Sequence, residues 1–158
     1  ITSQPKFGQI IDVEVPTYVA GLLRFENGGV GNIITSFDTW NSTLPHIEIY
    51  GTKGTLIVPD PNSFGGPVLL STLDGSGFKE IPLTYIYTDN SRGVGVSDMA
   101  QCILDNRTDN RASGQLANHV LEIMSAIHTA SNKKIIYQMK TKINKPNPMS
   151  NNLIRGMV

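Results

Sequence analysis

Two strand-like runs that meet at Asn27-Gly28-Gly29 constrain the fold of this chain more than any other feature. An Asn-Gly turn between alternating apolar runs is the strongest short-range signal for a β-hairpin. Within residues 17–38, apolar side chains occupy both faces: Val19, Leu23 and Phe25 on one, and Tyr18, Ala20 and Leu22 on the other. A sheet with one face in water carries polar side chains on that face. The pattern therefore predicts a hairpin that needs cover on both sides.

The composition indicates a single domain with buried interfaces. The chain has 158 residues, of which 16% are charged, whereas about 25% is typical of soluble domains. Thirteen basic and thirteen acidic residues cancel, which argues against a nucleic-acid or anionic-membrane partner. No apolar run reaches the length of a membrane span. We therefore expect a protein that does not bind nucleic acid or membranes.

Short turns also join the other predicted strands into pairs. Residues 1–10 read as a strand lead-in, and residues 46–60 as two strands around Gly51-Thr52-Lys53-Gly54. Val68–Leu73 and Lys79–Leu83 form another pair around a Gly- and Ser-containing turn. Connections this short join antiparallel neighbours, whereas parallel strands need long crossovers. About six or seven antiparallel strands are predicted.

The hydrophobic period changes from strand-like to helical after residue 90. The first predicted helix has Ser91 or Ser97 as its N-cap and ends at Asn106. Its apolar positions are Val96, Met99, Ala100, Ile103 and Leu104. The second has Ser113 as its N-cap and closes at residues 132–134. Its stripe consists of Leu116, Val120, Ile123, Met124 and Ile127.

The order of elements predicts an α+β fold. Strands followed by helices indicate a large, mainly antiparallel sheet with two helices packed on one face. A last strand is expected at Ile135-Ile136-Tyr137, so the domain covers residues 1–139 and residues 140–158 form a C-terminal tail. The second face of the sheet then requires a partner subunit or another domain.

The sequence contains almost no constellation for chemistry. Arg92-Gly93-Val94-Gly95 lacks the third glycine of a dinucleotide loop, because Asp98 stands at that position. His46, His119 and His128 are too widely spaced to predict a zinc site. We therefore assign no catalytic, cofactor-binding or metal-binding residue to this chain.

One loop does combine side chains that suit a ligand. Tyr87, Asn90 and Arg92 lie just before the first predicted helix, and loops on rigid scaffolds often carry binding groups. Arg and Tyr together suit a hydroxyl- or carboxylate-bearing ligand. The alternative is a local salt bridge from Arg92 to Asp89 or Asp98. The loop is our candidate wall of a substrate pocket.

Two single residues leave further alternatives open. Trp40 could stack on a sugar ring, although filling the edge of the hairpin is the preferred interpretation. Cys102, the only cysteine, is expected to be a small buried residue on a helix. A lone thiol excludes an internal disulfide and is compatible with a reducing compartment. We expect a cytoplasmic location.

Four segments of the chain resemble, in their order and spacing, those of a known family. They are residues 20–38, 47–68, 90–103 and 110–124. The sequence resembles the C-terminal domain of the glucose-fructose oxidoreductase, inositol dehydrogenase and MocA type of NAD(P)-dependent dehydrogenase. The most specific segment is the turn IEIYGTKGTL, which is a structural motif. The resemblance extends over nearly the whole chain.

The resemblance implies an antiparallel-sheet domain that follows an N-terminal Rossmann domain, which binds NAD or NADP. It implies a homo-oligomer that associates through the open sheet face, and a sugar or polyol as substrate. The family's Gly-x-Gly-x-x-Gly, Glu-Lys-Pro and catalytic Asp/His segments are absent here. No residue of this chain matches those motifs, so none is assigned their roles. We therefore expect the chain to be a non-catalytic piece of a longer enzyme, in which Ile1 comes after the catalytic segment.

Two alternatives remain open at this point. One is a free-standing binding or scaffold module without catalytic activity. The other is an inactive family member that keeps a Rossmann domain but has lost the catalytic lysine.

Overall fold

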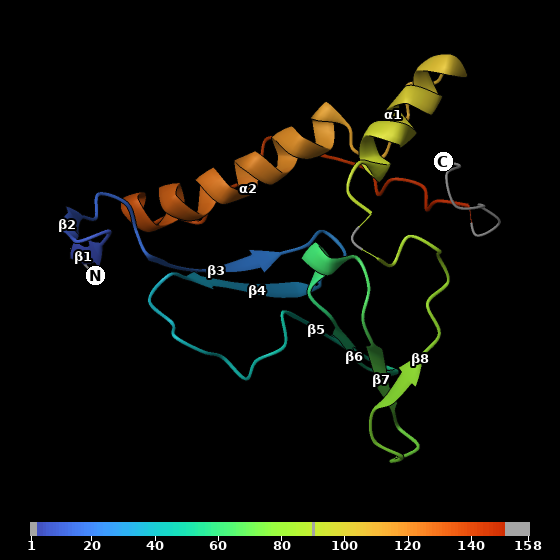
Figure 1. Ribbon diagram of the computed structural model, residues 1–158, viewed down its shortest axis with the longest axis horizontal. Coiled ribbons are helices and arrows are strands. Elements are labelled where there is room, and N and C mark those ends of the chain that lie inside the picture. Colours follow the sequence, from blue (N-terminus) through green and yellow to red (C-terminus); the bar gives the residue numbers. More distant parts are fainter. Residues whose placement is uncertain (1–2, 90, 151–158) are drawn as a thin grey trace. The chain divides into compact units, whose positions relative to one another are not determined.

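The computed structural model describes residues 3–89 and 91–150 and confirms the α+β class. Figure 1 shows its elements along the chain. They are β1 Ser3–Lys6, β2 Gln9–Asp12, β3 Tyr18–Arg24, β4 Val30–Ser36, β5 Ile47–Gly51, β6 Gly54–Val58, the 3-10 helix η1 Pro61–Ser63, β7 Val68–Thr72, β8 Lys79–Ile81, α1 Val94–Leu104 and α2 Gly114–Lys133.

The chain divides into two compact units. The first, here the hairpin unit, comprises Ile1–Thr43 and Glu122–Met139, and the second, the sheet unit, comprises Leu44–Leu121 and Lys140–Val158. Helix α2 therefore contributes residues to both units. The division predicted from the sequence, a domain of residues 1–139 and a tail of 140–158, stays a prediction.

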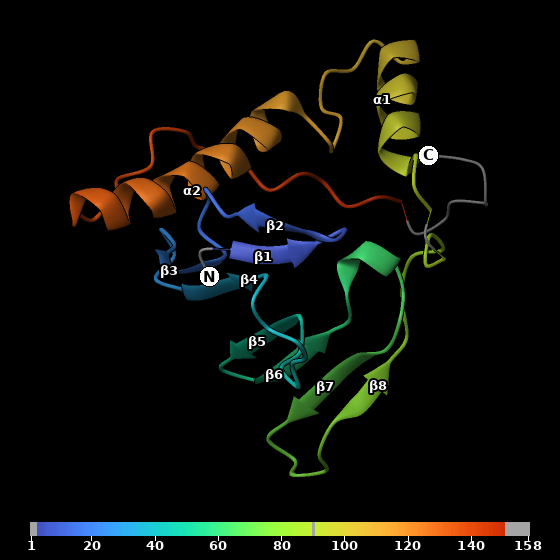
Figure 2. The same cartoon turned by 60° about the vertical axis from the view of Figure 1, so that its left-hand side comes forward.

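All strands pair antiparallel, as predicted. Hydrogen bonds join them into three ladders within the described residues: β1 with β2, β3 with β4, and β5-β6-β7-β8 in that order. Figure 2 shows the four-stranded ladder as a meander. The sequence suggested one continuous sheet. A short turn fixes the register of its own two strands, whereas nothing in the alternation specifies pairing between ladders.

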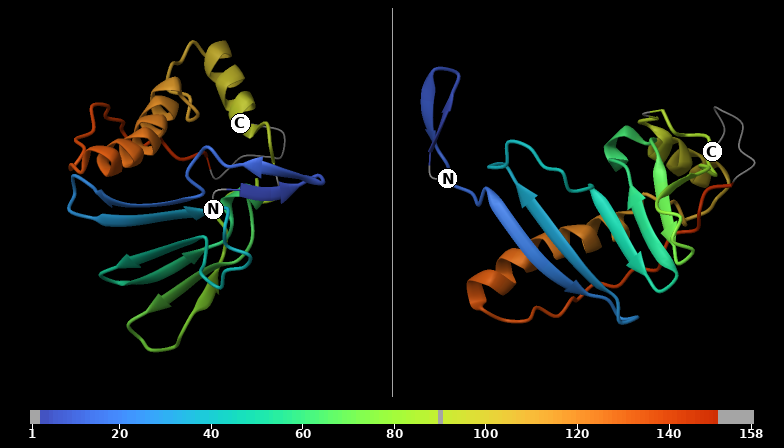
Figure 3. Two further views of the ribbon diagram at one scale, coloured as in Figure 1. Left: turned by 90° about the vertical axis from the view of Figure 1, so that its left-hand side faces the viewer. Right: turned by 90° about the horizontal axis from the view of Figure 1, so that it is seen from below.

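The β3–β4 hairpin of the hairpin unit confirms the turn signal (Figure 3). Gly28 has a φ of +87°, a conformation that glycine adopts without strain. The amide of Phe25 donates to the carbonyl of Gly29 at 2.9 Å, and the Asn27 side chain accepts from the Gly29 amide at 3.0 Å. These bonds set the register in which Tyr18 faces Ser36.

The two faces of this hairpin have different surroundings. Side chains on the inner face are half-buried in β3, and a Cβ built on Gly21 would lie 3.2 Å from Ile127 of α2. On the outer face Leu22 remains 68% exposed and Ile34 57% exposed. The predicted apolar alternation is therefore present, and α2 covers the inner face only.

Helix α1 begins differently from the prediction. Its N-cap is Gly93, at a φ of +97°, and no side chain caps it, so neither Ser91 nor Ser97 does. Glycine adopts this positive φ without strain, which suits Gly93 and not a serine to the N-cap position. The predicted end is confirmed, because Asn106 adopts a φ of +52° and its amide donates to the carbonyl of Ile103.

Helix α2 begins and ends as predicted. The hydroxyl of Ser113 accepts a hydrogen bond from the Leu116 amide at 3.2 Å, which is N-cap geometry. At the other end, Lys134 has a φ of +54°, and its amide donates to the carbonyl of Ser131. The helix therefore closes within the Asn-Lys-Lys segment.

The strand predicted at residues 135–137 is wrong, since the segment has no strand conformation. The amide of Ile135 instead donates to the carbonyl of Ala130 and closes α2. The Tyr137 hydroxyl donates to the Glu122 carboxylate at 3.1 Å. Side-chain contact with the helix, and not a ladder, thus holds this segment.

Candidate functional site

The most deeply buried polar group of the described residues lies on α1. Asp98 is 4% exposed and accepts hydrogen bonds from the backbone amide of Arg111, at 2.8 Å, and from the Arg111 guanidinium. A carboxylate is buried at tolerable cost only when it is paired and hydrogen-bonded in this way. The loop between α1 and α2 is therefore anchored on an ion pair.

This anchor decides which face of α1 is covered. Asp98 and Cys102, one turn apart, are the buried positions of the helix, and Cys102 is 2% exposed as predicted. The apolar positions that revealed the helix stay open to solvent: Val96, Met99, Ile103 and Leu104 are all exposed. Hydrophobic spacing thus identified the helix, but a charged partner selected the face that packs.

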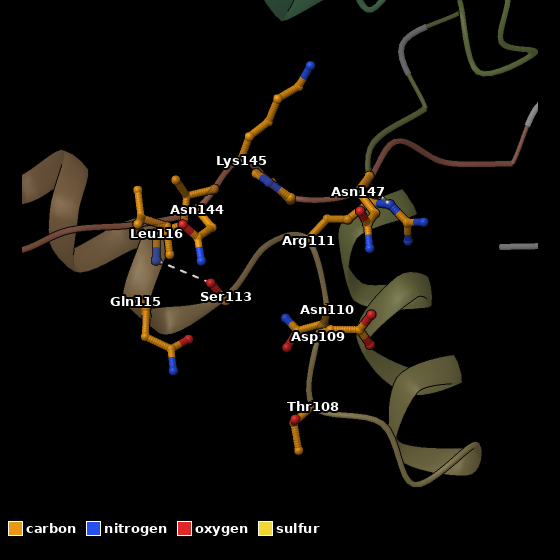
Figure 4. A pocket seen from close by; sticks show the side chains of 12 residues that line it. Thr108, Asp109, Asn110, Arg111, Ser113, Gln115, Leu116, Asn144, Lys145 and Asn147 are labelled. Atoms are coloured by element: carbon orange, nitrogen blue, oxygen red, sulfur yellow. Dashed lines mark hydrogen bonds between the residues drawn. The ribbon is translucent and has the colours of Figure 1, made fainter. Parts of the chain in front are cut away.

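Arg111 also holds the C-terminal tail. Its Nε donates to the carbonyl of Asn147 at 2.9 Å, and its Nη2 donates to the carbonyl of Pro148 at 3.0 Å. A second bond links His119 of α2 to the Thr141 hydroxyl at 2.7 Å. Between residues 141 and 148, the predicted C-terminal tail is therefore held on the sheet unit by these hydrogen bonds; Figure 4 labels Arg111 and Asn147.

The candidate substrate loop packs on a second loop of the same unit. The Arg92 guanidinium donates to the backbone oxygen of Asn62 at 3.1 Å and to its side-chain oxygen at 2.6 Å. It also lies 5.7 Å from the centre of the Phe64 ring, a cation–π distance. The alternative salt bridge to Asp98 is wrong, because that carboxylate pairs with Arg111. Both Asn62 acceptors are neutral, so they leave the charge of Arg92 in place.

The structure describes one of the other two residues that were predicted for this loop. Tyr87 is half-buried and precedes Thr88, whose backbone oxygen lies so close to Gly65 that a Cβ on Gly65 would clash with it. Asn90 lies outside the described residues. Thr88, the neighbour of Tyr87, and Arg92 thus both contact loop 61–66.

Three residues that form these contacts were not predicted from the sequence: Asn62, Phe64 and Arg111. The first two lie in a Gly- and Pro-rich stretch that reads as a simple turn, and Phe64 has a φ of +68°, which its sequence does not suggest. For Arg111 a signal existed. An aspartate on the face of a helix that also carries Cys102 requires a cation, and Arg111 is one of two arginines in the following loop.

The structure also shows the surroundings of Trp40 and His46, two other residues considered in the sequence analysis. Trp40 is fully exposed, so the preferred interpretation that it fills the hairpin edge is wrong. His46 lies 4.0 Å from the Asp60 carboxylate, and both side chains are largely exposed. Within residues 3–89 and 91–150 no group of three or more His, Cys, Asp or Glu side chains could hold a metal ion. No helix in that part of the chain is long and apolar enough to cross a membrane.

Comparison with known proteins bears on the N-terminal part of the chain. Residues 2–57 match the model of the GFO/IDH/MocA C-terminal domain. This range contains β1 to β5, the Asn-Gly hairpin and the IEIYGTKGTL turn. No curated protein and no solved structure matches the chain. Residues 2–57 are therefore similar to the GFO/IDH/MocA C-terminal domain, which confirms the predicted resemblance over that part of the chain.

Proposed function

We propose that this chain forms the substrate-side and subunit-contact domain of an NAD(P)-dependent oxidoreductase that acts on a sugar or polyol. The family match of residues 2–57 carries the proposal, because the GFO/IDH/MocA family consists in general of NAD(P)-dependent enzymes. The chain alone is not catalytic. Its partners are its own N-terminal Rossmann domain, a second copy and a small sugar-like substrate, and its location is cytoplasmic.

The cofactor does not fit this chain. The sequence has no Gly-x-Gly-x-x-Gly segment, which binds the pyrophosphate of a dinucleotide at a helix N-terminus. When bound by the Rossmann domain of the whole protein, NAD or NADP supplies a hydride acceptor for oxidation of an alcohol. The contribution of this chain is to hold and orient the substrate.

The proposed substrate wall is the loop with Tyr87, Asn90 and Arg92. Two geometric facts support the assignment. Arg92 is pre-positioned by Asn62 and Phe64, so little side-chain freedom is lost when it binds a hydroxyl or carboxylate group. Its charge is not compensated by those neutral contacts, so it keeps its attraction for an electron-rich ligand atom.

Steady-state kinetics of the whole protein test this wall. Arg92→Ala should raise KM about tenfold and leave kcat nearly unchanged, because it removes a contact that does not take part in hydride transfer. Arg107→Ala, an exposed arginine paired with Asp105 and Asp109, is the matched control and should change neither constant. Equal kinetics for the Arg92→Ala variant and the native protein would remove the loop from the substrate pocket.

The outer face of the β3–β4 hairpin is the proposed subunit contact. Tyr18, Leu22, Val30 and Ile34 are each more than half exposed on one face, where a water-facing sheet would be polar. Leu22→Asp should convert an oligomer into a monomer in size-exclusion chromatography with light scattering, whereas Lys53→Asp, in the β5–β6 turn, should not. If the charge at Leu22 does not change the mass, the contact is elsewhere.

The alternatives predict different results. A free-standing binding or scaffold module would have no Rossmann domain encoded beside it. An inactive family member would bind NAD(P)H without turning over any sugar or polyol. The same kinetic assay and a cofactor-binding measurement on the whole protein therefore separate all three functions.

A further inference from the structure

The turn Asn27-Gly28 at the tip of the β3–β4 hairpin brings reactive groups together in addition to joining the strands (Figure 3). It is the one Asn-Gly pair in the sequence, and both of its residues are exposed to solvent. In such a pair the backbone nitrogen of the glycine can attack the side-chain carbonyl carbon of the asparagine, because the glycine has no Cβ that obstructs the approach. Neither the substrate wall nor the subunit contact proposed above includes these two residues.

The nucleophile of this reaction, the Gly28 nitrogen, is held by a single hydrogen bond. Its N–H donates to the carbonyl of Phe25 at 3.0 Å, and a Cβ built on Gly28 would meet no atom within 4 Å. One neutral hydrogen bond at an exposed turn lowers the population of the free N–H by at most about tenfold. The nitrogen is therefore released when the tip of the hairpin opens locally, and the hairpin unit does not have to unfold.

The electrophile, the carboxamide of Asn27, is polarised by the same turn. Its Oδ1 accepts a hydrogen bond from the Gly29 amide at 3.0 Å. A Cβ built on Gly29 would lie 3.2 Å from that oxygen, so the carboxamide is folded back onto the backbone of the glycines. Negative charge develops on Oδ1 when Cγ is attacked, and a backbone N–H at this distance stabilises such a charge as in an oxyanion hole. The turn therefore activates its own asparagine.

We infer that Asn27 is a site of spontaneous deamidation in the folded chain. In the first step the Gly28 nitrogen forms a bond to Cγ of Asn27 and the bond from Cγ to the side-chain nitrogen breaks. Ammonia leaves, carrying the proton that the Gly28 amide has lost, and a cyclic succinimide remains. Water then hydrolyses the succinimide at one of its two carbonyl groups, which gives either aspartate or isoaspartate. Water is the co-reactant of both products, and no atom is oxidised or reduced.

The two products have different consequences for the hairpin. Aspartate keeps a side-chain oxygen that accepts the Gly29 amide, and it adds one negative charge to the tip. Isoaspartate lengthens the main chain by one carbon inside a turn that is closed by the bond from the Phe25 amide to the Gly29 carbonyl. Because the turn sets the register of the two strands, isoaspartate should loosen the pair Arg24 and Val30 first. None of this depends on the proposed oxidoreductase function.

Incubation of the purified chain in mildly alkaline buffer, followed by peptide mapping with mass spectrometry, tests the inference. Asn41 is the internal comparison in the same digest, because it is equally exposed but is followed by Ser42, which carries a Cβ. Asn27 should be converted more than about tenfold faster than Asn41, with release of ammonia and formation of isoaspartate. In the Asn27→Gln variant the conversion at this position should disappear, because a glutamine would have to form a larger ring.

The same map of the chain in urea shows whether the folded state itself reacts. One protecting hydrogen bond predicts that the folded chain reacts at most about tenfold more slowly at Asn27 than the unfolded chain. Protection by about a thousandfold or more would mean that the reaction requires global unfolding, and it would overturn the inference. Conversion of Asn41 as fast as Asn27 in the folded chain would overturn it as well, because the turn would then contribute nothing.

Discussion

Removing the Arg111 side chain should destabilise the sheet unit far more than removing another arginine of the same loop. In the Arg111→Ala variant the Asp98 carboxylate, only 4% exposed, loses its cationic partner. Two tail carbonyls also lose their donors. A buried charge left without its partner costs about 3–5 kcal/mol. The exposed tail bonds add less, because water replaces the lost donors.

The structure places the expected loss at the lower end of that range. Asp98 still accepts the backbone amide of residue 111 at 2.8 Å, and the Arg111 side chain is itself 30% exposed. We therefore expect the free energy of unfolding to fall by about 3 kcal/mol. Arg107→Ala removes an exposed arginine from two exposed ion pairs, so its loss should be about 0.2–1 kcal/mol.

Urea unfolding followed by far-ultraviolet circular dichroism gives both free energies, and hydrogen exchange gives a local readout. Exchange over residues 141–148 should accelerate in Arg111→Ala and not in Arg107→Ala, because only the former releases the tail. Arg111→Lys should give an intermediate loss, since an ammonium group cannot reproduce the planar fork of donors. If Arg111→Ala and Arg107→Ala lose the same stability, Asp98 is not the buried anchor described above.

Three further perturbations have directions that the structure defines. Gly65→Ala should lower the free energy of unfolding in urea by about 2–3 kcal/mol, because the added Cβ would clash with the Thr88 carbonyl. Gly114→Ala is the control: the space around Gly114 is open, so this variant should raise the free energy of unfolding by about 0.5 kcal/mol. The hydroxyl and amide of Ser76 hold the pKa of the Asp74 carboxyl below its ordinary value. The ionised Asp74 carboxylate therefore contributes to stability above about pH 4, and this contribution is lost as the pH falls. Ser76→Ala should raise the pKa of Asp74 in an NMR titration. Burial and the hydrogen bond to Glu122 raise the pKa of Tyr137. The neutral Tyr137 phenol therefore contributes to stability below about pH 10, and this contribution disappears at higher pH. A Tyr137→Phe variant should lose less stability than the native chain when the pH rises above that value.

Local structure was predictable where a turn or cap residue acts on its immediate neighbours. Asn27 and Gly28 determine the β3–β4 turn, and Ser113 determines the start of α2, because each forms its hydrogen bonds within three residues. The resemblance of the hairpin and of the IEIYGTKGTL turn was equally readable, since it depends on sequence alone.

Long-range partners were not predictable in the same way. Nothing in the sequence indicates that Arg92 binds Asn62, thirty residues away, or that Arg111 holds the carbonyl of Asn147. Ile135 and Tyr137 have strand-forming side chains, but a strand exists only where a neighbour supplies a ladder, and here the Tyr137 hydroxyl binds Glu122 instead. The face that α1 buries was also hidden, because a buried ion pair outweighed the apolar stripe.

Turnover by the whole protein is the measurement that bears most directly on the proposed function. A panel of sugars and polyols should be incubated with the whole protein and with NAD or NADP, and reduced cofactor followed by absorbance at equal protein concentrations. We predict formation of NADH or NADPH with at least one neutral substrate, and neither cofactor binding nor turnover by the isolated chain. The proposal fails if the whole protein binds no dinucleotide, or if the isolated chain binds NADH stoichiometrically.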